Sequence, residues 1–118
     1  MNPNNVDINV ESQEKDEASY LKSMDSLMDK LSEKYRDLSQ NNGLSYEQIL
    51  NYGFNIQDIA KERRNGGFGL FAADDGAVLN QKLQRFANES KYIRVELQVG
   101  KFYLTQEGIN LCKRIQNL

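Results

Sequence analysis

The sequence of 118 residues contains no histidine and a single cysteine, Cys112. One cysteine cannot form an internal disulfide, and a chain without histidine has no classical zinc site and no Ser-His or Cys-His dyad. We therefore expect a protein that is not an enzyme and that has no metal site and no cofactor. Cys112 is expected to be a small residue of the core.

Long apolar runs are also missing. No stretch of about 18 consecutive apolar residues, the length that spans a bilayer, occurs in the chain. The first residues lack the basic start and apolar centre of a signal peptide. We expect a cytoplasmic protein with no membrane partner, associated with the nucleoid if it binds DNA.

The formal net charge is only −2, but the charge is unevenly divided along the chain. Residues 1–43 contain five Lys/Arg and nine Asp/Glu, which gives −4, whereas residues 44–118 contain ten against eight, which gives +2. A mildly basic domain behind an acidic extension is compatible with phosphate contacts on one face of the domain.

Composition and residue spacing divide the chain into three parts. Residues 1–15 are rich in Asn, Asp, Glu and Gln and contain too little apolar surface to offset their ordering entropy, so they predict a flexible tail. The alternation of Val6, Ile8 and Val10 leaves a short strand as the alternative. Residues 16–43 predict one long helix, and residues 44–118 predict a folded domain.

The long helix carries apolar residues at alternating spacings of three and four, a strict heptad pattern. These residues form the heptad seam: Leu21, Met24, Met28, Leu31, Tyr35 and Leu38. The pattern has two interpretations, a helix that packs on its own domain and a coiled-coil dimerisation element that pairs with a second copy. The seam is narrow and continuous, which favours the homodimer.

Turn and cap residues divide the rest of the chain into short elements. The patterns predict a helix opened by the capping box Ser45 to Gln48, a helix capped by Asn55 that runs to about Arg64, a brief strand at Phe68–Phe71 and a helix capped by Asp74 or Asp75 that ends near Glu89. Two strands follow, residues 93–99 and 102–104, joined by a turn at Gly100, and the alternating pattern of the first puts Ile93, Val95, Leu97 and Val99 on its inner side. Thr105 is expected to cap a last helix over residues 106–115.

This order resembles the winged-helix (winged helix-turn-helix) domain. The resemblance covers about 75 of the 118 residues and is carried by a helix leading into a strand, followed by a Tyr-x-Leu-Thr-x-x-Gly entry to the closing helix. The matching residues are Leu83, Phe86, Tyr92, Ile93, Tyr103, Leu104, Thr105 and Gly108. The resemblance implies a mainly α fold with a small β-hairpin (α+β), in which the third helix enters the DNA major groove.

Several side chains are candidate contacts to double-stranded DNA. Amide side chains at the exposed face of the third helix can pair with an adenine edge, and cations can reach phosphate or guanine. The candidate residues are Lys61, Arg63, Arg64, Asn80, Gln81, Lys82, Gln84, Arg85, Lys91, Arg94 and Lys101. The alternative interpretation is that the amides are ordinary solvated residues and that the cations near Arg64 complement a helix dipole.

The leading hypothesis is a sequence-specific DNA-binding protein, a homodimeric transcriptional regulator paired through the heptad seam. The alternative is a winged-helix protein-protein interaction module that does not bind DNA. Phe68, Phe71 and Tyr103 would serve the second function if they are exposed.

Overall fold

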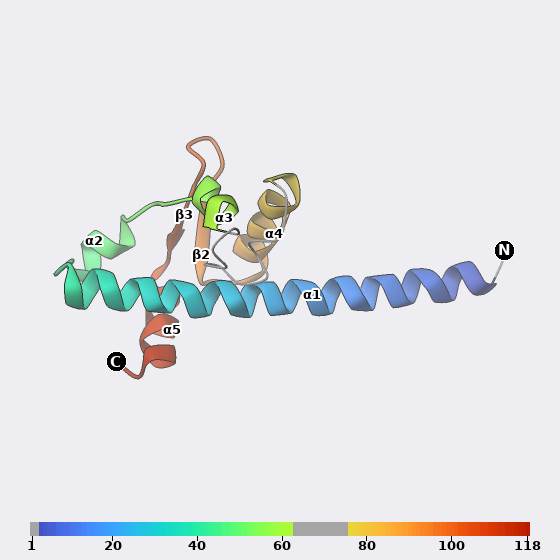
Figure 1. Ribbon diagram of the computed structural model, residues 1–118, viewed down its shortest axis with the longest axis horizontal. Coiled ribbons are helices and arrows are strands. Elements are labelled where there is room, and N and C mark those ends of the chain that lie inside the picture. Colours follow the sequence, from blue (N-terminus) through green and yellow to red (C-terminus); the bar gives the residue numbers. More distant parts are fainter. Residues whose placement is uncertain (1–2, 63–75) are drawn as a thin grey trace.

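The computed structural model describes residues 3–62 and 76–118, with side chains described for residues 17–59 and 76–118. The fold is mainly helical with one small antiparallel sheet, as the predicted α+β class requires. A long helix, α1 (Pro3–Arg36), crosses the molecule with α5 on one side and the sheet, α3 and α4 on the other, and its first turns extend beyond the other elements (Figure 1).

Helix α1 starts at Pro3, whereas the sequence predicted a flexible tail over residues 1–15. Proline fits the first turn of a helix because its missing N–H would be unpaired there, and no glycine or proline follows before Gly43. At the other end the helix widens into a π-helical turn, η1 (Asp37–Asn41). Gly43 then adopts a left-handed φ of 66°, which confirms the predicted stop.

In its described residues, 44–62 and 76–118, the domain after Gly43 contains seven elements. They are α2 (Tyr46–Leu50), β1 (Phe54–Asn55), α3 (Ile56–Glu62), α4 (Gly76–Glu89), β2 (Ile93–Glu96), β3 (Lys101–Leu104) and α5 (Gln106–Gln116). The caps predicted at Ser45, Asn55 and Thr105 are confirmed, and the cap predicted at Asp74 or Asp75 lies outside the described residues. Ser45 and Gln48 form a reciprocal capping box, Asn55 Oδ1 accepts from the backbone N–H of Gln57 at 2.9 Å, and Thr105 Oγ1 accepts from that of Gly108 at 3.1 Å.

The sheet has the order β1-β3-β2, with all pairs antiparallel. The sequence did not predict β1, because two residues are too short for an alternating pattern. Phe54 of β1 pairs with Phe102 of β3, and their rings stack with centroids 5.4 Å apart, which ties β1 to the sheet. The strand expected at Phe68–Phe71 lies outside the described residues.

The first strand of the hairpin is shorter than the predicted strand, which covered residues 93–99. Strand β2 ends at Glu96, and a turn closed by the bond from Gly100 N–H to the Leu97 carbonyl leads to β3. Leu97 and Val99, predicted to face inward, are 46% and 58% exposed in this turn. Gly100 has a φ of 66°, so the chain reverses here before those two residues can pair in the sheet.

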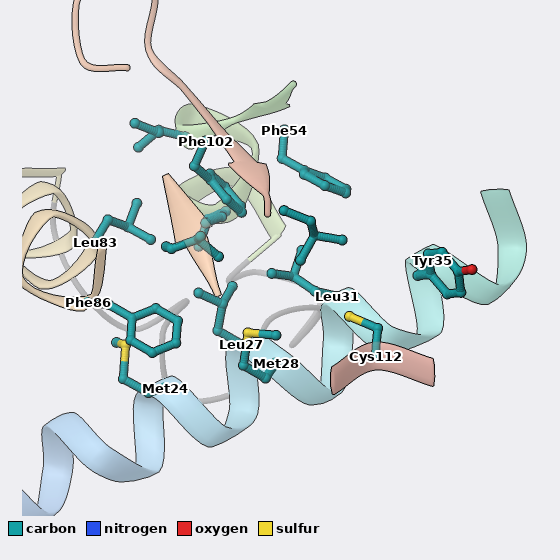
Figure 2. Packing of buried hydrophobic residues seen from close by; sticks show 14 of the residues in the cluster. Met24, Leu27, Met28, Leu31, Tyr35, Phe54, Leu83, Phe86, Phe102 and Cys112 are labelled. Carbon is teal, nitrogen blue, oxygen red and sulfur yellow. The ribbon is translucent and has the colours of Figure 1, made fainter. Parts of the chain in front are cut away.

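The core lies between α1, the sheet, α4 and α5. Figure 2 shows Leu27 and Leu31 of α1 projecting from the helix toward the sheet residues Phe102 and Phe54. Helix α5 is held against α1 by Gln116, whose side chain donates to Ser32 Oγ at 2.8 Å and accepts from Arg36 at 2.9 Å. Cys112 is fully buried beside this contact, which confirms the prediction of a core residue.

Most of the heptad seam belongs to this core. Met24, Met28, Leu31 and Tyr35 are buried within one protomer, Leu38 is half-buried, and only Leu21 is exposed, at 54%. The spacing of three and four therefore reflects packing of α1 on its own domain. Two copies could not pair through these four side chains without opening the core, so the proposed dimerisation role of the seam is corrected.

Candidate nucleic-acid interface

Helix α4 separates a core face from a solvent face. Leu79, Leu83 and Phe86 recur at spacings of three and four and are buried, because 3.6 residues per turn put them on one side. The opposite face is exposed and carries four amide side chains. These residues, which we call the amide face, are Asn80, Gln81, Gln84 and Asn88. Their side chains each offer two donors and an acceptor and carry no charge.

Arg85 does not belong to the amide face. Its guanidinium donates to Glu17 of α1 at 2.6 Å and to Glu89 of α4 at 2.8 Å. Glu89 also accepts from the Tyr20 hydroxyl at 3.4 Å. The hydrogen bonds to Glu17 and Glu89 raise the pKa of the Arg85 guanidinium. The pKa of the Tyr20 hydroxyl is also raised, first by burial and second by the negative charge of Glu89. Arg85 therefore joins α4 to α1, and the predicted contact with DNA would require its guanidinium to leave these partners.

Arg94 is also engaged within the chain. It forms an ion pair with Glu96 and lies over the Tyr103 ring, with its guanidinium carbon 3.9 Å from the ring centroid. Arg94 and Tyr103 are register partners across β2 and β3, so the stacking follows from the strand pairing. Tyr103, which was a candidate for an exposed apolar contact, is half-buried beneath this arginine.

The hairpin offers two further cations. Lys101 starts β3 and is exposed, opposite Glu96 of β2 and Asn55 of β1 in the strand register. Lys91 is exposed in the turn before β2, where its carbonyl accepts from Thr105 Oγ1. Neither lysine forms an ion pair with another residue in the parts of the chain whose side chains are described.

The remaining candidates are less informative. Lys82 is half-buried on the side of α4. Arg63 and Arg64 lie outside the described residues, as does the side chain of Lys61 at the end of α3. The described surface thus carries a neutral amide face on α4 and two exposed lysines, Lys91 before β2 and Lys101 at the start of β3, which the antiparallel register places at opposite ends of the hairpin. Asn88 was not among the predicted contacts, although its spacing of four from Gln84 places it on the same face.

Comparisons with known protein families, curated proteins and solved structures found no match to this chain. The architecture alone places the protein in the class of mainly helical α+β domains, with a three-stranded antiparallel sheet joined to a long N-terminal helix.

No helix in the described part of the chain combines the length and apolar character needed to cross a bilayer. Within the same residues, no three His, Cys, Asp or Glu side chains gather as metal ligands would.

Proposed function

We propose that this chain is a winged-helix protein that binds double-stranded DNA and acts in the cytoplasm, or on the nucleoid, as a transcriptional regulator. The order of elements supports the fold: two short helices, α2 and α3, flank a strand, then a helix leads into a hairpin and a closing helix. The sheet order β1-β3-β2, in which the first strand pairs with the returning strand of the hairpin, supports it further.

The amide face is the observation that carries the proposed function. Asn and Gln side chains can pair bidentately with adenine in the major groove, which accepts a helix. Asn80, Gln81 and Gln84 are exposed on α4, while the other side of the helix is fixed by Leu79 and Leu83. A rigid helix with its polar groups held outward is suited to read base edges.

Affinity for the backbone would come from the hairpin. Lys91 and Lys101 are exposed and can contact phosphate, and each such contact releases counterions and makes binding sensitive to salt. Two described lysines give a weak electrostatic contribution per protomer. A homodimer would double both the lysines and the amide faces, which is the usual solution for a two-fold DNA site.

The homodimer would use the outer face of α5 in place of the heptad seam. Glu107 precedes the half-buried Leu111 by four residues, and the exposed Arg114 follows it by three. If two α5 helices pack antiparallel around Leu111, Glu107 of each copy lies opposite Arg114 of its partner, as a two-fold contact requires. Ile115 is exposed next to this stripe, in the wall of a groove of about 440 Å³ whose α1 side carries Met24 and Met28 together with Asp25 and Asp29.

The direct test measures binding to duplex DNA at low and rising salt. We expect the chain to bind random duplex, and to select A·T-containing sites from a randomised pool. Asn80→Ala with Gln84→Ala should keep the affinity for random duplex and lose the selection, because amides read bases and not phosphate. Absence of duplex binding at low ionic strength would refute the proposal.

A second function, protein-protein binding, is favoured by one observation. Leu97 and Val99 are exposed at the tip of the hairpin, where a phosphate-binding wing would be expected to carry cations. An apolar tip suits contact with another protein surface. If this function holds, Leu97→Ser with Val99→Ser should abolish capture of the partner and leave duplex binding, if any, unchanged.

A further inference from the structure

A cavity of about 330 Å³ lies between the end of α1 and the edge of the sheet formed by β1. Leu38 from the π-helical turn η1, Tyr52 before β1 and Phe54 within β1 supply its apolar wall. Lys34, Asp37, Asp58 and Lys101 supply its charged groups. Its volume lies at the lower end of the range of small-molecule sites, about 300–1,000 Å³, and departures of a helix into π geometry are frequent at functional sites.

The aromatic wall is preformed. Phe54 is buried and stacked on Phe102, and the Tyr52 ring meets the edge of Phe54 with centroids 5.0 Å apart. Tyr52 itself is 41% exposed, so part of its ring remains open toward the cavity or solvent. An aromatic ligand could stack on this ring in an offset or edge-to-face arrangement.

The charged groups differ in how far the protein already uses them. The Asp37 carboxylate accepts hydrogen bonds from the side chains of Asn41 at 2.8 Å and Asn42 at 3.1 Å. Asp58 and Lys101, in contrast, form no ion pair with any residue among those whose side chains are described. One anionic and one cationic group are thus left to a ligand, beside an aromatic ring.

We propose that this cavity binds a small aromatic zwitterion of the size of an aromatic amino acid. Its ring would pack against Tyr52, its anionic group would pair with Lys101, and its cationic group would pair with Asp58. Gly53 contributes by lacking a side chain, since a Cβ there would lie 2.6 Å from Lys101 Cδ and displace that lysine from the wall. Lys101 is also a phosphate contact of the proposed DNA-binding surface, so the ligand and duplex DNA would compete for this lysine.

The chain contains no tryptophan, so the fluorescence of added L-tryptophan can be excited selectively and reports its own binding. We expect saturable anisotropy and a blue shift with the full chain. Tryptamine, which has only the cation, and indole-3-acetate, which has only the anion, should each bind about tenfold more weakly, as expected for the loss of one charged hydrogen bond. L-Leucine should not compete.

Lys101→Met and Asp58→Asn should each weaken tryptophan binding about tenfold, and Tyr52→Leu should weaken it too. Lys22→Met and Glu47→Gln are the matched controls, because both residues are exposed and neither lines the cavity. Thermal melts of every variant separate loss of the site from loss of the fold. The proposal is overturned if millimolar tryptophan gives no signal, if the analogues bind as tightly, or if folded Lys101→Met and Asp58→Asn bind normally.

Discussion

The guanidinium carbon of Arg85 lies 3.7 Å from the centroid of the Tyr20 ring, which joins helix α4 to helix α1. The same guanidinium bonds to Glu17 and Glu89, so an arginine expected at a DNA surface instead connects two helices. Because α4 carries the amide face, this contact also fixes the direction in which that face points.

Arg85→Met should therefore lower the melting temperature and leave duplex affinity nearly unchanged at a temperature where the variant is folded. Both carboxylates lose their partner and the ring loses its cation. Lys22→Met, an exposed change on α1, is the control and should alter neither quantity. A variant with normal stability but weakened duplex binding would return Arg85 to the DNA-contacting set.

Lys101→Met should weaken binding to random duplex and reduce the slope of log affinity against log salt by about 1, the value for one lost phosphate contact. The mechanism is loss of one released counterion per protomer. Fluorescence anisotropy of labelled duplex at several salt concentrations measures the slope. An unchanged slope would mean that the hairpin does not touch the backbone, even if the affinity falls.

The self-association surface is tested by exchanging charges on α5. Arg114→Glu should leave two carboxylates facing each other and shift the protein toward monomer, whereas Glu107→Arg with Arg114→Glu should restore the dimer with reversed ion pairs. Sedimentation equilibrium gives the association constant. Lys22→Glu, which changes the net charge by the same amount at an exposed position of α1, is the control for charge alone. If the double variant stays as monomeric as Arg114→Glu, the antiparallel arrangement is wrong.

Gly108→Ala should destabilise the protein by about 1–3 kcal/mol, the usual cost of overpacking. A Cβ at this position would overlap the backbone carbonyl of Tyr92, which cannot swing away as a side chain could. At Gly76 an added Cβ meets nothing within 4 Å, so Gly76→Ala should be neutral or stabilise α4 by up to about 1 kcal/mol. Urea unfolding monitored by far-UV circular dichroism compares the two substitutions, and equal effects would contradict the packing of α5 against Tyr92.

Ionisation of Cys112 should lower the free energy of unfolding of the protein at alkaline pH. Burial raises the pKa of the Cys112 thiol from 9.0 to about 12 in the folded state. The unfolded chain therefore loses this proton first, and the thiol's contribution to stability is complete below pH 9 and is lost as the pH rises toward 12. The free energy of unfolding of the wild type, minus that of Cys112→Ala, should fall across this range. A difference that stays constant with pH would show that the thiol ionises equally in both states.

The amino-acid sequence by itself determined the local elements of this protein. The Ser45 to Gln48 capping box, the stop at Gly43, the caps at Asn55 and Thr105 and the buried stripe of α4 all depend on residues within one or two turns of each other. Such short-range signals are sufficient because the hydrogen bonds and spacings that they use are local. The mainly α fold with a hairpin followed from their order.

Only the tertiary structure decided which partner each side chain has. The same heptad spacing serves a coiled coil or a helix packed on its own domain, and the burial of Met24, Met28 and Leu31 selected the second. Arg85 meets Glu17, 68 residues away, and β1 exists because Phe54 stacks on Phe102. Contacts across such distances depend on how the elements pack, since spacing along the chain states which face a residue occupies but not what lies opposite that face.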